Sequence, residues 1–370
     1  MVAPLVHPDR PDRVRSLLLT AEVDALVVSD LTNLRWLTGF SGSAGVAVLD
    51  AERLVVITDG RYDVQARTQL AASGVTGEVF VGTTQDELLT LLAGAAAHAR
   101  VGFEAAHTSV STHQRWQAAL TGALVATTGV VEAARRAKSP AEIERIACAA
   151  AIADEALADV VDHIRPGITE VALRNLLEIR MRELGAEGPS YETIVAAGPQ
   201  HAALPHHRPK ATEVADGDTV VIDVGALVEG YHSDMTRTFL VGEPSAEQLR
   251  WYDLVAASQA AGLAVVRAGV AASAVDAACR SVFAEAGVEA WFVHGTGHGV
   301  GLLIHEDPFL NGSATDTLRE GDVVTVEPGL YRVGLGGVRI EDLVVVTSDG
   351  HRNLTHSPKD QPCLPSPPTT

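Results

Sequence analysis

Short apolar runs alternate with helical patterns over the first 130 residues. Runs of four to six residues suit buried strands, whereas longer segments with apolar positions three or four residues apart suit helices. The predicted strands are residues 25–29, 45–49, 54–57, 78–81 and 100–103, and the predicted helices are residues 14–22, 62–70 and 85–98. Such alternation is typical of an α/β domain built on a mixed sheet.

The pattern changes at Ser139, where a long helix is predicted to begin. Ser139 can cap this helix, Pro140 suits its first position, and Glu142 follows three residues after the serine. A chain of 370 residues is also longer than one ordinary core supports. We therefore predict two domains, residues 1–135 and 136–370.

The second domain contains two segments of similar design. Each begins with a pair of helices, which we predict at residues 139–164 and 169–184 in the first half and at 245–268 and 272–287 in the second. Each pair is followed by strands that carry acidic residues. This recurrence predicts an α/β (α+β) fold with a pseudo-twofold core and a site on the shared axis. The tail contains five prolines after residue 357, and we expect about its last ten residues to be disordered.

Composition and charge narrow the possible partners. The net charge of -19 disfavours nucleic acid and anionic membranes, because both require clustered lysine and arginine. No apolar segment approaches the roughly 18–20 residues that span a bilayer, and the N-terminus lacks the apolar core of a secretion signal, so we expect a cytoplasmic protein. The three cysteines are widely spaced and predict neither a disulfide framework nor a thiolate metal site.

The glycine-rich stretch at residues 29–45 is a possible phosphate loop by composition. It follows a predicted strand and contains a short predicted helix. It lacks both the Gly-Lys-Ser/Thr ending and a dinucleotide fingerprint, so we do not assign it to phosphate binding.

Acidic residues at the ends of apolar strands are the main chemical signal. An aspartate or glutamate in such a position is costly to bury unless it is paired or bound to a cation. The four strand-associated acids are Asp223, Asp234, Glu327 and Glu341, and a histidine, His298, lies in the glycine-rich segment 291–305. Singly, each acid could be paired with an arginine, and the histidine could be a core residue.

Together, the four acids point to metal. Like charges at close range cannot all remain ionised without compensating cations, and two divalent ions would balance four carboxylates. One imidazole among carboxylate oxygens is a hard ligand set, which favours manganese, although cobalt, zinc or iron would also fit. Two metals bridged by carboxylates form a known hydrolytic arrangement.

Five segments carry these residues in an order that resembles the pita-bread metallopeptidases, specifically the proline-specific branch of aminopeptidase P and prolidase. The segments are VIDVGA (221–226), YHSDMTRTF (231–239), HGTGHGVG (294–301), VEPGLY (326–331) and VRIED (338–342). Residues 33–45 also resemble the creatinase-like N-terminal domain of that branch. The resemblance thus spans nearly the whole chain.

The resemblance implies a role for each matching residue. Asp223 would bind one metal, His298 and Glu327 the other, and Asp234 and Glu341 both. His206 would face the metals and bind substrate, His305 would contact the substrate carbonyl or the proline, and His294 would be a further pocket histidine. Glu327 would also move a proton. Tyr331 would line the pocket, and Arg339 would orient Glu341 or close the pocket. Structural roles fit Tyr231, His207 and Arg237 at least as well.

The implied reaction is hydrolysis of the peptide bond before proline. A hydroxide bridging the metals would attack the carbonyl, His305 would stabilise the oxyanion, and the proline nitrogen would leave protonated by Glu327 or a histidine. We favour an Xaa-Pro aminopeptidase, with an Xaa-Pro dipeptidase as the alternative, and we expect a homodimer. A metal-free binding protein and a creatinase-like hydrolase on the same fold are disfavoured because all five ligand positions are occupied by suitable residues.

Overall fold

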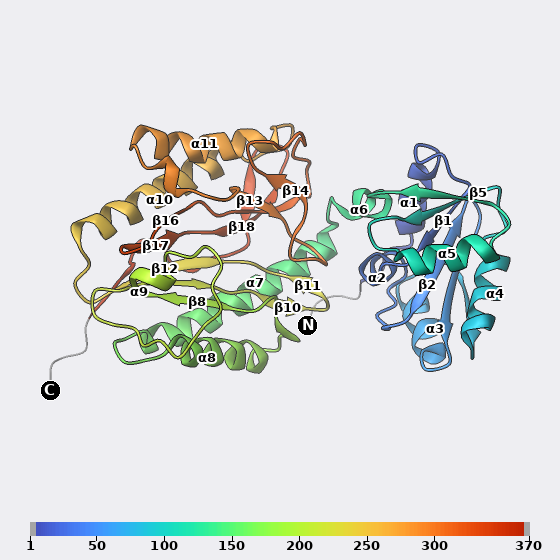
Figure 1. The fold of residues 1–370 in the computed structure, drawn as a ribbon, viewed down its shortest axis with the longest axis horizontal. Helices are drawn as coiled ribbons and strands as arrows, with labels where there is room; N and C mark the ends of the chain where they lie inside the picture. Colours follow the sequence, from blue (N-terminus) through green and yellow to red (C-terminus); the bar gives the residue numbers. More distant parts are fainter. Residues whose placement is uncertain (1–4, 366–370) are drawn as a thin grey trace. The chain divides into compact units, whose positions relative to one another are not determined.

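The computed structural model describes residues 5–365 and shows two compact units (Figure 1). Contacts between residues divide the chain between Arg135 and Arg136. Among the described residues, no helix is both long enough and apolar enough to cross a membrane.

The N-terminal unit is built on a six-stranded mixed sheet. Its strand order is β4-β3-β2-β1-β5-β6, with β1, β2 and β3 antiparallel and the remaining pairs parallel. The strands are β1 (Ala25–Val28), β2 (Gly45–Asp50), β3 (Leu54–Asp59), β4 (Glu78–Gly82), β5 (Arg100–Glu104) and β6 (Ala123–Thr127). The helices are α1 (Arg10–Leu18), α2 (Leu31–Thr38), α3 (Asp63–Ala72), α4 (Gln85–Ala95), α5 (Val110–Ala119) and α6 (Val130–Arg135). The predicted mixed-sheet α/β architecture is confirmed.

In the C-terminal unit, strands lie between two pairs of helices (Figure 1). The first pair is α7 (Pro140–Val160) and α8 (Glu170–Glu183), and the second is α10 (Ala246–Val265) and α11 (Ala272–Glu285). One apolar cluster packs α7 and α8 against strands of the first half, and a second cluster packs α10 and α11 against strands of the second half. The helix, helix, sheet order predicted for each half is therefore present.

The strands of this unit form four sheets. They are ordered β11-β10-β7, β20-β12-β9-β8, β14-β13-β15-β18-β19 and β16-β17. The first-half strands are β7 (Gly188–Pro189), β8 (Ile194–Ala197), β9 (Thr219–Asp223), β10 (Ala226–Val228), β11 (Tyr231–His232) and β12 (Thr236–Val241). The second-half strands are β13 (Gly297–Gly299), β14 (Glu306–Leu310), β15 (Val323–Val326), β16 (Gly329–Arg332), β17 (Gly336–Arg339), β18 (Asp342–Val346), β19 (His351–Asn353) and β20 (Cys363–Leu364).

Helix α7 begins where the sequence predicted and ends earlier than predicted. The Ser139 side chain accepts from the Glu142 N–H and the Glu142 side chain accepts from the Ser139 N–H, so the predicted capping box is present. The helix ends at Val160, four residues before the predicted end, because residues 161–163 tighten into a 3₁₀ turn. The short helix α9 (Gly198–His201) follows β8 directly.

Part of the tail that was expected to be disordered forms a strand. Cys363 and Leu364 form β20, which pairs in parallel with β12. The N–H of Leu240 donates to the carbonyl of Pro362, and the N–H of Gly242 donates to that of Leu364. These backbone bonds hold a segment that has few side chains to bury. The rest of the predicted disorder, at residues 366–370, lies outside the described residues.

Gly225 lies where the backbone of β9 turns toward β10. A Cβ atom at this position would lie 1.9 Å from the carbonyl oxygen of Ser233, which is far inside van der Waals contact. Only glycine permits this approach, which brings the chain after Asp223 next to the chain before Asp234.

We predict that Gly225→Ala lowers the free energy of unfolding by about 1–3 kcal/mol, because the backbone must move to relieve the overlap. Urea denaturation measures this change. Gly94→Ala is the control, since a Cβ at this position in the last turn of α4 would meet no atom within 4 Å, and it should not lower stability. Equal stability of Gly225→Ala and wild type would contradict the prediction.

Candidate metal centre

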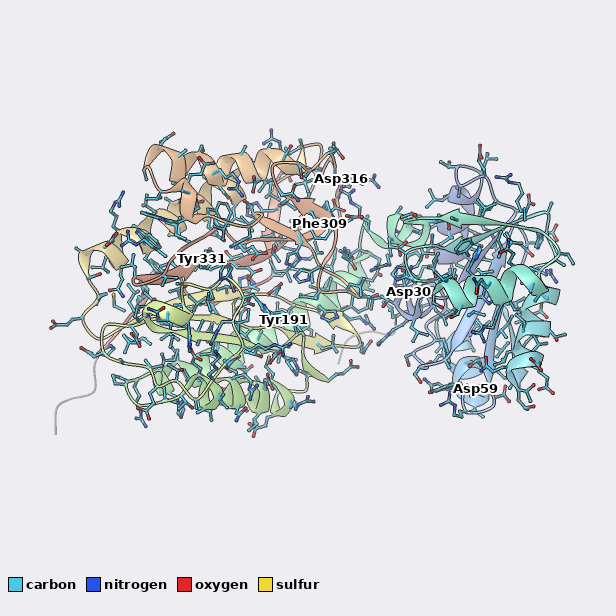
Figure 2. All side chains as sticks on the ribbon, viewed as in Figure 1. Asp30, Asp59, Tyr191, Phe309, Asp316 and Tyr331 are labelled. Atoms are coloured by element: carbon cyan, nitrogen blue, oxygen red, sulfur yellow. The ribbon has the colours of Figure 1, made fainter. Side chains whose placement is uncertain are left out.

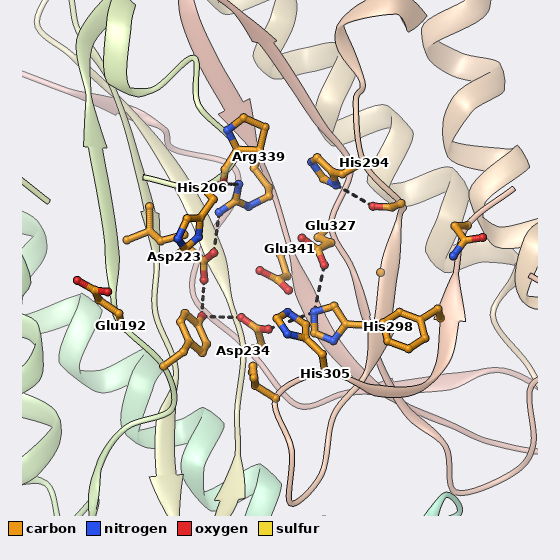
Figure 3. Close-up of a pocket in the computed structure, with 18 residues that line it drawn as sticks. Glu192, His206, Asp223, Asp234, His294, His298, His305, Glu327, Arg339 and Glu341 are labelled. Carbon is orange, nitrogen blue, oxygen red and sulfur yellow. Dashed lines mark hydrogen bonds and ion pairs between the residues drawn. The ribbon is translucent and has the colours of Figure 1, made fainter. Parts of the chain in front are cut away.

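Five residues that are distant in sequence line one cavity of about 410 Å³ in the C-terminal unit (Figure 3). Asp223 is the last residue of β9, Asp234 precedes β12, His298 lies in β13, Glu327 follows β15, and Glu341 precedes β18. Each residue lies in a short strand or within two residues of the end of one. The structure therefore brings together all five residues that the sequence singled out.

Strand pairing explains the convergence of the acids. In the first half, Thr236 of β12 pairs with Asp223 of β9, so Asp234 enters the cavity close to Asp223. The segments between these strands form β10 and β11 of a separate small sheet. In the second half, Val326 pairs with Asp342, which places Glu327 and Glu341 next to each other.

One backbone hydrogen bond links the two halves at the cavity. The N–H of Glu341 donates to the carbonyl of Thr236 over 3.1 Å. The Thr236 hydroxyl also donates to Glu341 Oε2 over 2.7 Å. These contacts place Glu341 of the second half beside Asp234 of the first half, and Figure 3 shows its side chain within the group of acids.

The ionised forms of Asp234 and Glu341 are destabilised, which raises the pKa of each. Burial raises the pKa of Asp234 well above its ordinary value, and the negative charges of Asp223 and Glu327 raise it further. Burial likewise raises the pKa of Glu341, followed by the charges of Asp234, Glu327 and Asp223. Repulsion among like charges in a site that excludes water is the physical cause.

His298 pairs with two of the four acids, Glu327 and Asp234. Its Nε2 atom lies 3.3 Å from Glu327 Oε1 and 3.5 Å from Asp234 Oδ2. Burial alone would lower the pKa of His298, but the hydrogen bond and charge of Glu327 outweigh it and raise that pKa. The same pairing lowers the pKa of Glu327 to about 2 in spite of its burial. His298 thus supplies part of the positive charge that balances these acids.

The donor set fits a divalent cation. Ligand atoms of Asp234, His298 and Glu341 all lie within 4.8 Å of one another. Glu341 Oε1 is buried and has no hydrogen-bond partner among the described residues, which is costly unless a cation binds it. His298 Nδ1 lies 3.1 Å from the carbonyl of Gly299, so its hydrogen is directed there and Nε2 is left to face the acids.

Arg339 pairs with an acid other than Glu341. It was expected to orient Glu341 or to close the pocket, and it lines the cavity with its Nη2 atom 2.6 Å from Asp223 Oδ2. The chain leaves the β16-β17 sheet after Arg339 and enters another sheet at Asp342, so the two side chains take different directions. Burial would lower the pKa of Arg339, but Tyr331 and the surrounding carboxylates raise it well above its ordinary value, so the guanidinium remains charged.

Tyr191 is a cavity residue that the sequence did not indicate. Its hydroxyl contacts both Asp223 and Asp234, the second over 2.5 Å. Burial, together with the charges of three nearby carboxylates, raises its pKa well above the ordinary value, so it is a neutral hydrogen-bond donor. Figure 2 shows Tyr191 among the strands between the helix pairs. No motif marks it, because its contacts depend on how the loop after β7 folds back.

The predicted pocket histidines occupy different positions around the cavity. His206, His294 and His305 all line it. His305 is exposed, and its ring packs edge-on against that of His298 with centroids 4.3 Å apart. Partial desolvation and the positive charge of His298 lower the pKa of His305. Burial also lowers the pKa of His294, whose Nε2 lies 2.9 Å from the hydroxyl of Tyr331.

Tyr331 lies behind the cavity wall. It is buried and is not among the lining residues, contrary to the prediction that it lines the pocket. Its hydroxyl also accepts from Arg339 Nη1 over 3.0 Å, so it reaches the cavity only through His294 and Arg339. Glycines at 329 and 337 let its ring lie against the backbone, which turns it away from the open space.

The cavity has one arginine and no lysine among its lining residues. That arginine is Arg339, whose three nitrogens donate to Asp223, Tyr331, Thr236 and the carbonyl of Pro205. The outer part of the cavity is lined by Glu192, Ile304, Phe309 and Asn311. It therefore presents no uncommitted arginine or lysine to a ligand.

Comparison with known proteins agrees with this geometry. Residues 144–348 match the model of metallopeptidase family M24, and residues 10–137 match that of the creatinase/prolidase N-terminal domain. The peptidase YqhT of Bacillus subtilis is 38% identical over 352 residues, which are 94% of this chain and 98% of that protein.

Solved structures are similar over nearly the whole chain. The Xaa-Pro dipeptidase from Bacillus anthracis has a TM-score of 0.93 and 36% identity, covering 96% of this chain and 99% of that one. The X-Pro aminopeptidase from Thermotoga maritima has a TM-score of 0.87 and 32% identity, covering 96% and 100%. With its five converging metal-type ligands, its pita-bread fold and these matches, the chain belongs to metallopeptidase family M24.

Proposed function

We propose that this peptidase is an Xaa-Pro aminopeptidase, which hydrolyses the peptide bond between an N-terminal residue and a following proline. The observation that carries the proposal is the convergence of four carboxylates and one imidazole in a single cavity. Relatives named for Xaa-Pro cleavage support the choice of substrate.

Asp223, Asp234, His298, Glu327 and Glu341 are the residues that would hold two divalent ions, with Asp234 and Glu341 shared between them. Oxygen ligands with one imidazole favour manganese, and cobalt, zinc or iron would also fit. When bound, the ions supply water activated for attack near neutral pH and withdraw electron density from the scissile carbonyl.

The chain's own groups bind the substrate and move protons. A lowered pKa keeps His305 neutral at physiological pH, so it can donate a hydrogen bond to the carbonyl oxygen as negative charge develops there. His206 faces the same space and binds the substrate, and His294 contributes to the pocket wall. Glu327 lies in the cavity with its ionised carboxylate directed at His298, where it can accept the proton that the attacking water loses and pass it to the departing proline nitrogen.

Arg339 and Tyr191 have supporting roles in this scheme. Both contact Asp223, and Tyr191 also contacts Asp234. They fix the orientations of these carboxylates. This kind of support from neighbouring groups is typical of metal ligands.

The outer cavity favours peptides longer than a dipeptide. An Xaa-Pro dipeptide ends in a carboxylate beside the scissile bond, and a site restricted to dipeptides needs a cation for it. The one lining arginine already donates to four groups, and Arg208, beside the cavity, is paired with Glu192 over 3.0 Å. Longer peptides carry their terminal carboxylate away from this wall.

The location and assembly belong to the same proposal. A cytoplasmic enzyme is consistent with the free thiols of Cys148, Cys279 and Cys363. We propose a homodimer, and light scattering of the purified protein measures its mass directly.

The first prediction concerns substrate length. We expect Ala-Pro-Ala to be cleaved with kcat/KM at least about 10-fold higher than Ala-Pro, and Ala-Pro-amide to be cleaved better than Ala-Pro, because the amide removes the unpaired charge. Ala-Ala-Ala is the control for proline specificity. Cleavage of Ala-Pro alone would establish the dipeptidase alternative instead, and no cleavage of any proline peptide by the metal-loaded enzyme would refute the proposed function.

The second prediction concerns one shared ligand. Asp234→Ala should lower turnover by more than about 100-fold, since even outer partners of a metal ligand contribute 10- to 100-fold. Circular dichroism and the melting temperature of the metal-free protein should show an intact fold, because the substitution removes a buried repulsive charge. Asp159→Ala, which removes a half-exposed carboxylate on α7, is the control and should leave turnover unchanged. Wild-type turnover by Asp234→Ala would mean that the centre lies elsewhere.

The third prediction concerns pH and metal removal. Raised pKa values of Asp234 and Glu341 mean that the folded metal-free protein binds protons more tightly than the unfolded chain does. These groups therefore favour folding at low pH and oppose it as the pH rises through their folded pKa values, above the ordinary range near 4. Bound cations remove this penalty, so Mn²⁺ should raise the melting temperature more at pH 8 than at pH 5.5. Potassium chloride at equal ionic strength is the control, and an equal or larger Mn²⁺ effect at pH 5.5 would contradict the prediction.

A further inference from the structure

The loop that carries His206 into the cavity is closed at both ends by one buried side chain. This loop comprises residues 198–209 and follows β8. At its start lies Ala197, and at its end lies Lys210. The backbone N–H groups of both residues donate to the carboxylate of Glu170, each over 2.8–2.9 Å.

Glu170 also accepts from two histidines of the same loop. Its Oε1 atom, which binds the Ala197 N–H, lies 2.8 Å from His201 Nδ1. Its Oε2 atom, which binds the Lys210 N–H, lies 2.9 Å from His207 Nε2. Since a carboxylate can only accept, each of these histidine nitrogens carries a hydrogen. Glu170 is the first residue of α8 and is fully buried, so water does not compete for these bonds.

The two histidines also support each other. Their rings stack with centroids 4.2 Å apart and an angle of 26° between planes. His207 is the direct neighbour of His206 and is itself buried. On the other side of His206, the carbonyl of Pro205 accepts from Arg339 Nη1 over 2.9 Å. The chain around His206 is therefore held on one side by Glu170 and on the other by Arg339.

A metal ion is a weaker explanation for this cluster. Glu170, His201 and His207 have the chemistry and spacing of three metal ligands. However, the Glu170 carboxylate already accepts four hydrogen bonds, two on each oxygen, which fills its capacity. Glu341 has a buried carboxylate oxygen without a hydrogen-bond partner, whereas no such atom occurs in Glu170, His201 or His207 among the described residues.

We propose that Glu170 is a positioning residue for catalysis, which acts through His206 by closing the loop that carries it. The inference rests on the proposed function, because it assumes that His206 contacts the substrate. Its consequence is that a residue on the buried face of α8, outside the cavity lining, controls the rate of peptide cleavage. Misplacement of a substrate-contacting group by about 1 Å can cost as much as 100-fold in rate.

The test is a double-mutant cycle on Ala-Pro-Ala with the metal-loaded enzyme. In Glu170→Gln, an NH₂ group replaces one oxygen, so two of the four donors lose their acceptor. We expect kcat/KM to fall about 10- to 100-fold. In the His206→Ala background, the same substitution should change kcat/KM less than about 3-fold, because the residue through which it acts is gone. A merely structural effect would persist in both backgrounds.

Two further variants control for folding. Glu142→Gln alters another buried helix-start glutamate of the C-terminal unit, which bonds Ser139 and Tyr231, and it should lower the melting temperature without changing kcat/KM. If Glu170→Gln does not fold, the pair His207→Gln and His207→Ala replaces it. Glutamine can still donate to Glu170 through its amide, so it should retain more activity than alanine.

Three results would overturn the inference. One is an unchanged kcat/KM in Glu170→Gln, another is an equal loss with and without His206, and the third is loss of one bound metal per chain in Glu170→Gln. Each of these three results counts only if the wild-type enzyme is active in the same assay. Failure of the wild type to cleave any proline peptide would refute the proposed function itself and is thus a separate outcome.

Discussion

Four carboxylates lie in one cavity of the C-terminal unit, and the charge that they share must be compensated whenever they are ionised. Burial and repulsion from the neighbouring acids raise the pKa values of both Asp234 and Glu341. Arg339 and His298 compensate part of the charge through Asp223 and Glu327. The unpartnered oxygen of Glu341 is left for a cation. A divalent metal would therefore stabilise the folded arrangement as well as serve the chemistry.

The fold satisfies this requirement by joining two similar halves. Each half has its own apolar core, and each contributes strand ends to the cavity. Neither half contains enough ligands for two ions. The backbone bond from Glu341 to Thr236 and the ion pair from Arg339 to Asp223 both cross between halves. Assembly of the metal centre is thus tied to correct packing of the whole unit.

The signals from which the sequence predicts this site are local. An acid at the end of an apolar run, as at Asp223 and Glu327, is visible in a few residues, and so are the capping box at Ser139 and the two helix pairs. The order of the five metal-ligand motifs along the chain indicated the family. Contacts that depend on long-range folding were not visible. Tyr191, the pairing of Arg339 with Asp223, and the closure of the His206 loop by Glu170 all join segments whose packing no local pattern encodes.

Titration of the metal-free protein with Mn²⁺ by isothermal calorimetry, in buffers of different ionisation enthalpy, tests the central claim most directly. The heats give the number of ions per chain, and their dependence on the buffer gives the protons released on binding. We predict two ions per chain, with protons released as the acids whose pKa values are raised become ionised. Binding of no ion or of one ion per chain, or binding without proton release, would contradict the account.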